Sequence, residues 1–373
     1  MKLLITGANG FIGRNLTSHL ARREGVEILP CDIATPPAEL QTFLSTCDGV
    51  FHLAGVNRPQ QIDEFERGNA GFTEELCRSL EAMGRKPFFI MTSSIQAEMD
   101  NPYGISKRHA EEALEGFSQR TGAPVVIYRL TNVFGKWCRP NYNSAVATFC
   151  HNIARDLPIT VSDAAREVRL VYIDDVIAAL LSCLDRPPVG QARRQALPEY
   201  TITLGHLVET VQAFRASRQT LRLPDMADEF IRKLYATYLS YLETDGFAYS
   251  LEQRTDARGV LAEFVKQPHV GQMFVSRTHP GITRGNHYHH TKVEKFLVLE
   301  GEAVIRFRPI AGDKVVEYRM SGRDFKVVDI PPGYTHAIEN VGPTEMIVLF
   351  WASEVFDPSA PDTYALNVKG ERE

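Results

Sequence analysis

The hydrophobic residues of this 373-residue chain follow one period in its first part and another in its second. Up to about residue 185, short apolar runs alternate with helical periodicity, as where Ile12, Leu16 and Leu20 recur every four residues. After about residue 246, the period falls to two, in short runs separated by turns rich in Gly and Pro. A chain of this length is too long for one ordinary core. The sequence therefore predicts two domains, residues 1–245 and 246–373.

The alternation of strands and helices in the first part predicts a doubly wound, Rossmann-like parallel sheet. Its buried strands are expected at KLLIT, GVFHLAG, PFFIMTSS and PVVIYRL. The polar stretch GQARRQALPEY is expected to be a loop, and two helical patterns follow it before residue 245. The short runs of the second part, among them KFLVLEG and MIVLFWAS, predict an all-β sandwich or barrel.

Composition excludes several classes of function. The net charge is -5 and no large basic patch is present, so nucleic acid is not expected as a partner. No apolar run approaches the roughly 20 residues that span a bilayer, and the first residues, MKLLITGANG, are a buried strand rather than a signal peptide. The 6 cysteines form no C-x-x-C pair and all lie in the first part, which indicates reduced thiols in a cytoplasmic protein.

A glycine-rich turn lies between the first expected strand and the first helix. Gly7, Gly10 and Gly13 leave the backbone free of side chains, so a pyrophosphate can approach the amides and the dipole of the helix N-terminus. Asp32 follows at the end of the second strand, where a carboxylate accepts hydrogen bonds from the adenosine ribose. The pattern predicts a dinucleotide site.

A tyrosine and a lysine supply the chemistry expected beside that site. Tyr103 and Lys107 stand four residues apart on one helix face, and a nearby ammonium lowers the pKa of a tyrosine and makes it a better proton relay. Ser94 ends the strand before them and is expected to orient a substrate carbonyl. Only nine residues separate Ser94 from Tyr103, so the choice between Ser93 and Ser94 stays open.

These residues, together with TGANGFIG, HLAG and VYIDD, make the first 245 residues resemble the extended short-chain dehydrogenase/reductase family. The resemblance implies hydride transfer to or from a nicotinamide, with Tyr103 as proton donor and Lys107 on the nicotinamide ribose. The cofactor-binding positions it implies are Gly7, Gly10, Phe11, Ile12, Gly13, Asp32, Ala54 and Lys107. Related reductases place substrate-binding residues near Lys136, Arg139 and Asn141, which are weak candidates, since a solvated loop explains them better.

The second part carries a cluster of histidines. His287 and His289 are two residues apart, so they face the same way on a strand, whereas His290 faces the other way. Glu294 begins the next expected strand and His336 follows PPGYT. Three imidazoles and one carboxylate suit Zn, Mn, Fe or Ni.

The spacing of the glycines around these residues resembles both halves of the cupin signature, over about residues 255–360, except that Phe325 stands where the second half usually has a glycine. The resemblance implies a small antiparallel barrel with one divalent metal inside, most simply zinc. His287, His289, Glu294 and His336 match the ligand positions, and His290 is a bystander or an outer residue.

Further stretches extend the resemblance to the whole length: LAGVNRP, DNPYG, FGKWCRPNYNS, KFLVLEGEAVIRFR and DIPPGYTHAIEN. Together they resemble the capsule and O-antigen biosynthesis enzymes of the CapF/WbjC type. That family implies a bifunctional enzyme on the route to UDP-N-acetyl-L-fucosamine, acting on a UDP-linked 4-keto-6-deoxy amino sugar. The cupin domain would epimerise C3 of a UDP-2-acetamido-2,6-dideoxy-4-hexulose, and the reductase domain would then reduce the C4 ketone.

Several points stay open on the sequence. The family is associated with NADPH, but Asp32 would repel a 2′-phosphate and argues for NADH; Arg22 and Arg23 need not reach that phosphate. Tyr288, Lys292 and Tyr334 lie near the metal ligands, and none of them is assigned as the C3 base. A homodimer is expected because both folds commonly dimerise. One alternative makes the cupin a structural module for dimerisation, and another makes it an iron dioxygenase.

Overall fold

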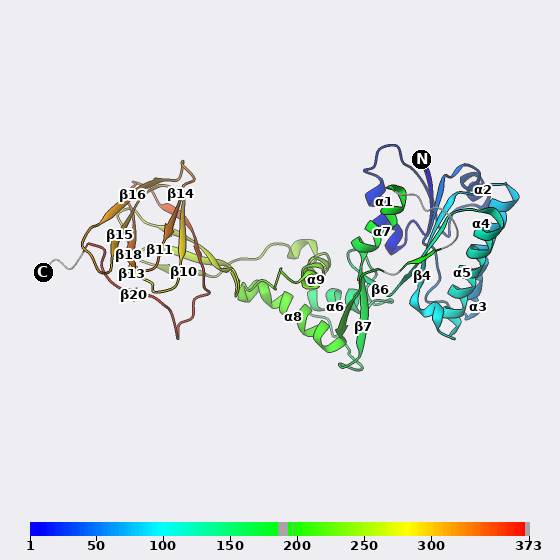
Figure 1. The fold of residues 1–373 in the computed structure, drawn as a ribbon. Helices are drawn as coiled ribbons and strands as arrows, with labels where there is room; N and C mark the ends of the chain where they lie inside the picture. The colour runs from blue at the N-terminus through cyan, green and yellow to red at the C-terminus, as the bar shows by residue number, and fades with distance from the viewer. Residues whose placement is uncertain (186–192, 196, 370–373) are drawn as a thin grey trace. The chain divides into compact units, whose positions relative to one another are not determined.

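The protein is described here as a computed structural model that covers residues 1–185, 193–195 and 197–369 (Figure 1). Its contacts divide it into two compact units: Met1–Gln212 with Lys233–Glu243, and Ala213–Arg232 with Thr244–Glu373. Residues 213–232, which the sequence placed in the first domain, therefore group with the second unit. Periodicity predicts the two helices that reach into this segment but not which core their apolar faces join. The division at residue 245 stays a prediction.

The first unit contains the predicted parallel sheet, with strand order β2-β1-β3-β4-β5-β8. The strands are β1 (Lys2–Thr6), β2 (Glu27–Cys31), β3 (Gly49–His52), β4 (Phe88–Ser94), β5 (Val125–Leu130) and β8 (Arg193–Gln195). β8 lies in the stretch expected to be a loop and pairs with β5. That expectation was wrong because a three-residue edge strand is held by backbone hydrogen bonds and needs no apolar pattern.

Helices cover both faces of this sheet, as a doubly wound fold requires (Figure 1). One face packs against α1 (Phe11–Leu20) and α7 (Ile173–Asp185), through residues such as Leu16 and Leu180. The other face packs against α2 (Pro37–Thr46), α4 (Phe72–Ala82) and α5 (Pro102–Thr121), through residues such as Leu44, Leu80 and Leu114. The carboxyl ends of the strands are thus left open for a ligand.

Short helices and a small second sheet complete the helical part of the chain. The helical segments are α3 (Asp63–Phe65), the π-helix η1 (Glu66–Gly71), η2 (Ile95–Glu98), α6 (Ala145–Ala154), α8 (Leu204–Thr220), α9 (Glu229–Leu239) and η3 (Thr244–Gly246). The small sheet joins β6 (Asn132–Phe134), β7 (Glu167–Tyr172) and β9 (Tyr200–Thr203). Within the described residues, no helix has the length and apolar character needed to cross a membrane.

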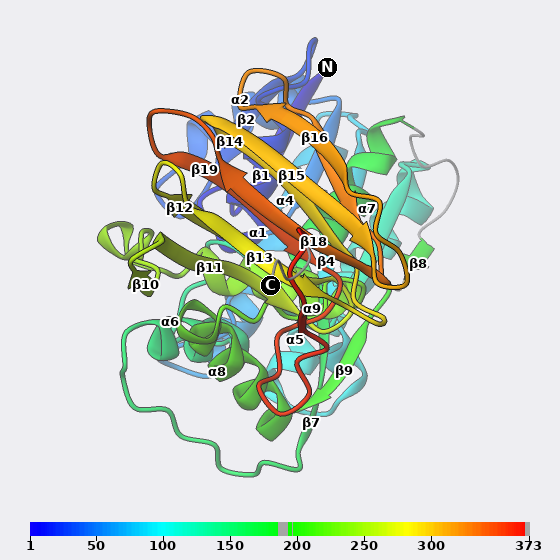
Figure 2. The ribbon, with the colours of Figure 1, turned by 90° about the vertical axis from the view of Figure 1, so that its left-hand side faces the viewer.

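The second unit is built from two antiparallel sheets, as the period of two predicts; Figure 2 shows β11, β12, β19 and β14 side by side. One sheet has the order β10-β11-β12-β19-β14-β17 and the other β16-β15-β18-β13-β20. The strands are β10 (Gln253–Asp256), β11 (Gly259–Gln267), β12 (Gly271–Thr278), β13 (Thr283–Tyr288), β14 (Glu294–Glu300), β15 (Glu302–Pro309), β16 (Val316–Ser321), β17 (Val327–Ile330), β18 (Tyr334–Asn340), β19 (Met346–Ala352) and β20 (Tyr364–Ala365). Inward residues of both sheets, among them Phe296, Ile305 and Ile338, form one core.

Candidate active site and candidate metal centre

The glycine turn after β1 is as tightly packed as the predicted role requires. Gly7 has φ +68°, and a Cβ there would lie 2.8 Å from the backbone nitrogen of Ala54. A Cβ on Gly13 would lie 2.1 Å from the carbonyl oxygen of Gly7, closer than two such atoms approach. Only glycine fits at either position, and the packing brings the first turn of α1 against the end of β3.

A cavity of about 930 Å³ opens over this turn. The glycine loop lines it together with the ends of β4 and β5, the side chains of Tyr103 and Lys107, and residues 137–140 and 142–144. The predicted cofactor positions Gly7, Gly10, Phe11, Ile12, Gly13 and Ala54 all line it. The cavity lies at the carboxyl ends of the parallel strands, where open α/β sheets bind their ligands.

The first turns of α5 hold the tyrosine and the lysine in the cavity wall. Pro102 begins the helix, and the Asn101 side chain accepts a hydrogen bond of 2.8 Å from the backbone nitrogen of Gly104. Lys107 is only 5% exposed, and its Nζ donates to the Thr92 carbonyl over 3.1 Å. Tyr103 and Lys107 line the same cavity because residues four apart share a helix face.

Burial moves the pKa of both groups. It raises the pKa of the Tyr103 hydroxyl, and a hydrogen bond with Ser94 acts in the opposite direction. The expectation that the nearby ammonium lowers this pKa was wrong, because burial outweighs the other causes. Burial lowers the pKa of Lys107 to about 8, against the attraction of the Glu111 carboxylate. At neutral pH Tyr103 therefore holds a proton that it can donate, and Lys107 is charged but close to its titration point.

The two candidate serines have different partners. Ser93 is buried and its hydroxyl donates a 2.5 Å hydrogen bond to the Glu111 carboxylate. Ser94 lines the cavity, interacts with Tyr103, and its Oγ accepts a 3.1 Å hydrogen bond from the nitrogen of Gln96. The hydroxyl of Ser93 is thus committed to a structural contact, whereas that of Ser94 lies beside the proton donor.

Asp32 lies at the end of β2, directly behind the cavity wall. One carboxylate oxygen accepts from the nitrogen of Ala34 over 2.9 Å, and the other accepts from the side chain of Asn9, which lines the cavity. Arg23 pairs with Asp185. The side chain of Arg23 is thereby committed to a carboxylate, and Asp32 reaches the cavity only through its contact with Asn9.

The loop after β6 corrects part of the substrate-site expectation. Lys136 lies 2.6 Å from Asp174 and the side chain of Asn141 contacts Asn152, and neither lines the cavity. Arg139 does line it, with its guanidinium 5.1 Å from the ring centroid of Tyr142. The correction has a physical reason: neighbouring side chains in an irregular loop point in different directions, so sequence position alone does not select among them.

Sequence reasoning missed other polar side chains of this wall. Arg14, at the start of α1, has its guanidinium 5.4 Å from the ring centroid of Trp137 and lines the cavity. Arg155 also lines it, and donates to the carbonyl of Tyr241 over 2.7 Å. For Arg14, its place directly after the glycine motif was the available signal. Arg155 had none, because α6 reaches the cavity only through the fold.

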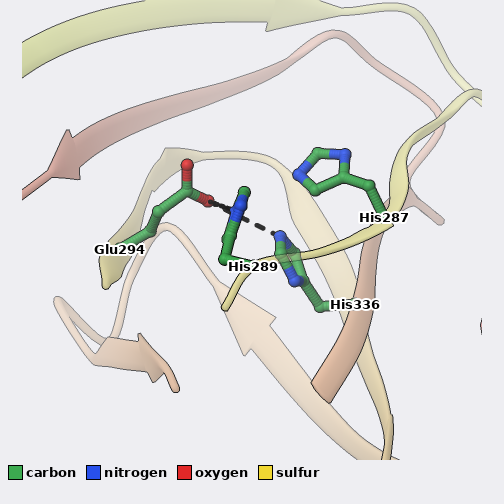
Figure 3. Close-up of side chains that lie close together, drawn as sticks. All are labelled: His287, His289, Glu294 and His336. Carbon is green, nitrogen blue, oxygen red and sulfur yellow. Dashed lines mark ion pairs between the residues drawn. The ribbon is translucent and has the colours of Figure 1, made fainter. Parts of the chain in front are cut away.

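The second unit brings the four predicted metal ligands together (Figure 3). One donor atom from each of His287, His289, Glu294 and His336 lies within 4.8 Å of the others. His287 and His336 are paired residues on β13 and β18, with a bulge between Gly285 and His287. Glu294 begins β14, and its Oε2 lies 3.6 Å from Nε2 of His289 and 3.5 Å from that of His336.

Two nitrogens of this cluster are buried without a hydrogen-bond partner: Nε2 of His289 and Nε2 of His336. Both atoms point toward the carboxylate of Glu294 (Figure 3). A buried nitrogen left without a partner is costly, and a metal ion at the centre would satisfy both atoms at once. Three imidazoles and one carboxylate therefore fit a divalent metal in their chemistry and their geometry.

The charges of the side chains in the cluster suit the binding of a cation. Burial acts to raise the pKa of Glu294, but contacts with His289 and His336 outweigh it and hold that pKa well below its usual range. Burial, together with the neighbouring His336, lowers the pKa of His287 to about 4. At neutral pH the cluster offers an ionised carboxylate and a neutral His287 imidazole.

The other candidates around the cluster have separate roles. His290 is exposed, and its ring lies against those of Tyr288 and Tyr364, in agreement with its interpretation as a bystander or outer residue. Lys292 is buried, and its Nζ donates to the carbonyl of Pro361 and the hydroxyl of Thr363, each over 2.9 Å. Tyr334 is 37% exposed.

Comparisons with known proteins agree with this architecture. Residues 3–196 match the NAD dependent epimerase/dehydratase family, and residues 254–364 match the polysaccharide biosynthesis C-terminal domain. The chain is 47% identical over 368 residues to the UDP-2-acetamido-2,6-beta-L-arabino-hexul-4-ose reductase of Pseudomonas aeruginosa, covering 99% of both chains.

Solved structures extend the likeness to the whole fold. The capsular polysaccharide assembling protein CapF of Staphylococcus aureus matches with a TM-score of 0.92 and 44% identity, over 99% of this chain and 100% of that one. The chain belongs to the CapF-type family. A structure of CapF with the inhibitor 3-isopropenyl-tropolone matches with a TM-score of 0.87 and 40% identity, over the same shares of the two chains. Membership confirms the predicted order of an extended reductase fold followed by an all-β domain.

Proposed function

We propose that this CapF-type protein is a bifunctional enzyme of capsule polysaccharide synthesis. Its second unit epimerises C3 of a UDP-2-acetamido-2,6-dideoxy-4-hexulose, and its first unit reduces the C4 ketone with NAD(P)H. The oxidoreductase class follows from family membership, since the Pseudomonas relative carries the name of a UDP-hexulose reductase. The proposed epimerase activity rests on one observation. The four predicted metal ligands lie together, and two of their nitrogens are buried without a hydrogen-bond partner.

The first unit holds the groups that ketone reduction needs. A bound nicotinamide supplies the hydride, and the glycine loop, Asp32 and Lys107 are the residues that would hold it. Tyr103 donates its proton to the C4 oxygen, because its raised pKa keeps the hydroxyl protonated at neutral pH. The charge of Lys107 stabilises the tyrosinate that remains. Ser94 orients the ketone from the end of β4.

We propose NADH as the better-fitting nicotinamide. A 2′-phosphate would meet the negative carboxylate of Asp32, which Ala34 and Asn9 fix in place. The guanidinium of Arg23, which would offset this charge if it were free, pairs with Asp185. An Asp32→Ala variant should therefore improve NADPH use relative to NADH, measured as the ratio of kcat/KM values.

In the second unit, His287, His289, Glu294 and His336 would hold one divalent metal, for which the ligand set favours zinc. Such an ion supplies a Lewis acid that stabilises negative charge on a sugar oxygen. The C3 proton is acidic because it lies α to the C4 carbonyl, so its removal and return on the opposite face inverts C3. The CapF inhibitor is a tropolone, whose adjacent oxygens are those of a bidentate metal chelator, and this supports a metal in the family.

The test separates epimerisation from reduction. The purified chain is incubated with the UDP-4-keto-6-deoxy amino sugar in D₂O without nicotinamide, and NMR follows deuterium at C3. We expect exchange in the parent chain and in Tyr103→Phe, and loss of exchange in His336→Ala. A folded parent chain that reduces the sugar but exchanges no deuterium would overturn the epimerase half and favour a structural β-domain.

A further inference from the structure

The last described segment of the chain folds back onto the histidine cluster. β20 pairs with β13, so that Tyr364 stands opposite Tyr288 and Ala365 opposite His287. The nitrogen of Leu366 donates to the carbonyl of Asn286 over 2.9 Å. These contacts bring Asp362, two residues before β20, to the turn that joins β13 and β14. That turn separates the proposed ligands His289 and Glu294.

The carboxylate of Asp362 holds this turn through four hydrogen bonds. One oxygen accepts from the backbone nitrogen of His290 over 2.9 Å. The other accepts from the nitrogens of Thr291 and Lys292 over 2.9 and 2.8 Å, and from the Thr291 hydroxyl over 3.0 Å. Three successive amides directed at one carboxylate are a backbone anion site, and they fix the conformation of the turn.

The backbone carbonyl of the same residue holds a ligand. It lies 2.6 Å from Nδ1 of His289. Because a carbonyl only accepts, the Nδ1 atom must carry the hydrogen, and Nε2 is left with a free lone pair. That lone pair faces Glu294 and His336, where Nε2 has no other partner. The contact thus sets both the tautomer and the direction of the ring.

We propose that Asp362 is a positioning residue for the cluster: its carboxylate clamps residues 290–292, and its carbonyl presents His289 in the metal-binding tautomer. The proposal rests on the proposed role of the cluster as a metal site. The support of His336 is weaker, since its Nδ1 lies 3.4 Å from the carbonyl of Tyr334, two residues away on its own strand. Asp362, which is far from His289 in sequence, therefore supports the site.

The backbone of Asp362 is part of the arrangement. Its φ of +38° belongs to the left-handed region, which Asp and Asn tolerate better than most side chains. Asp362→Asn keeps that tolerance and one acceptor oxygen but loses the charge, whereas Asp362→Ala loses both acceptors. Asp357→Ala is the matched control, because the exposed carboxylate of Asp357 contacts Ser359 and Ala360, in its own turn, and none of the ligands.

Two measurements on the full-length chain test the proposal. Zinc affinity is measured by competition with a chromophoric chelator for the parent chain and the three variants. The tautomer of His289 is measured on the metal-free proteins by nitrogen NMR of the imidazoles, and circular dichroism checks that each variant is folded. We expect zinc affinity to fall about 10- to 100-fold in Asp362→Ala, less in Asp362→Asn, and not at all in Asp357→Ala. We also expect mixed His289 tautomers in Asp362→Ala.

The possible results distinguish the positioning role of Asp362 from the metal-binding role of the cluster. A parent chain that binds no divalent metal overturns the metal role, yet a change of His289 tautomer in Asp362→Ala still supports the positioning role. Parent-like zinc affinity together with an unchanged tautomer in a folded Asp362→Ala overturns the positioning role. An equal loss of affinity in Asp357→Ala also overturns it, because the effect would then belong to the segment as a whole.

Discussion

The two candidate sites of this protein are built in opposite ways. The site of the first unit is a cavity of about 930 Å³, and its charged groups have protein partners, as Lys107 has in the Thr92 carbonyl. The site of the second unit is a closed cluster whose donor atoms lie within 4.8 Å of one another, two of them with no partner. The first has room for a large ligand, and the second has the donor atoms that the proposed metal ion requires.

The difference extends to how each site is held. Elements that are close in sequence carry the first site: the glycine turn belongs to β1 and α1, and Tyr103 and Lys107 share one helix. The second site joins strands β13, β14 and β18 with a turn clamped by Asp362, 73 residues from His289. A change in one site should therefore act on hydride chemistry alone, and a change in the other on metal binding and C3 exchange alone.

The largest expected effect is that of Tyr103→Phe on reduction. The variant keeps the ring beside Phe65 but loses the hydroxyl proton that Tyr103 would donate to the C4 oxygen, so kcat should fall about 100- to 10,000-fold. Stopped-flow oxidation of NAD(P)H measures this. Deuterium exchange at C3 should persist, and its loss in this variant would contradict the separation of the two sites.

His336→Ala should have the converse effect. It removes one of four ligands and leaves Glu294 with the two imidazoles of His287 and His289, so zinc affinity should fall by more than about 100-fold. Elemental analysis and chelator competition measure the metal. Reduction of a substrate that already has the inverted C3 should continue at the parent rate, and a matching loss of that rate would show that the sites are not independent.

Gly13→Ala tests the packing of the glycine turn. The added Cβ would lie 2.1 Å from the Gly7 carbonyl oxygen, so the turn must shift and the first turn of α1 move away from the bound phosphates. We expect dinucleotide affinity to fall about 10- to 100-fold and the first unit to lose about 1–3 kcal/mol of stability. Fluorescence titration with NADH and thermal unfolding measure these, with metal content as the unchanged control.

The titration of Lys107 gives the smallest expected effect. Raising the pH should increase the stability of the fold but decrease the rate of reduction. The folded-state pKa is lowered from 10.5 to about 8 by burial, so between these values the unfolded chain binds the proton that the folded chain has lost. Stability should therefore rise with pH across that window, by about 3 kcal/mol at most. Reduction should fall about tenfold per pH unit above 8, because the uncharged amine no longer supports Tyr103.

Lys107→Met is the control for that titration. A neutral side chain at this position should remove the rise in stability between pH 8 and 10.5, although the variant reduces ketone poorly at every pH. Thermal unfolding of parent and variant over this range measures the difference. An identical pH dependence in the two proteins would mean that Lys107 does not titrate in the window that its burial implies.

The sequence determined those features that depend on spacing within one element. A period of four predicted α1, a period of two predicted the β-domain, and the i, i+4 rule placed Tyr103 and Lys107 on one face. The two-residue spacing of His287 and His289 likewise predicted that both rings point the same way, and the structure brings them together with Glu294 and His336. Their roles as ligands stay a prediction for the metal titration.

Only the tertiary structure decided features that join distant segments. It gave the Ser93 hydroxyl a hydrogen bond to Glu111, and it paired Lys136 with Asp174 outside the cavity lining. It also brought Asp362 to the turn after His289, which no spacing in the sequence indicates. The reason is physical: backbone periodicity fixes the direction of a side chain within its own element, whereas its partner depends on the path of the whole chain.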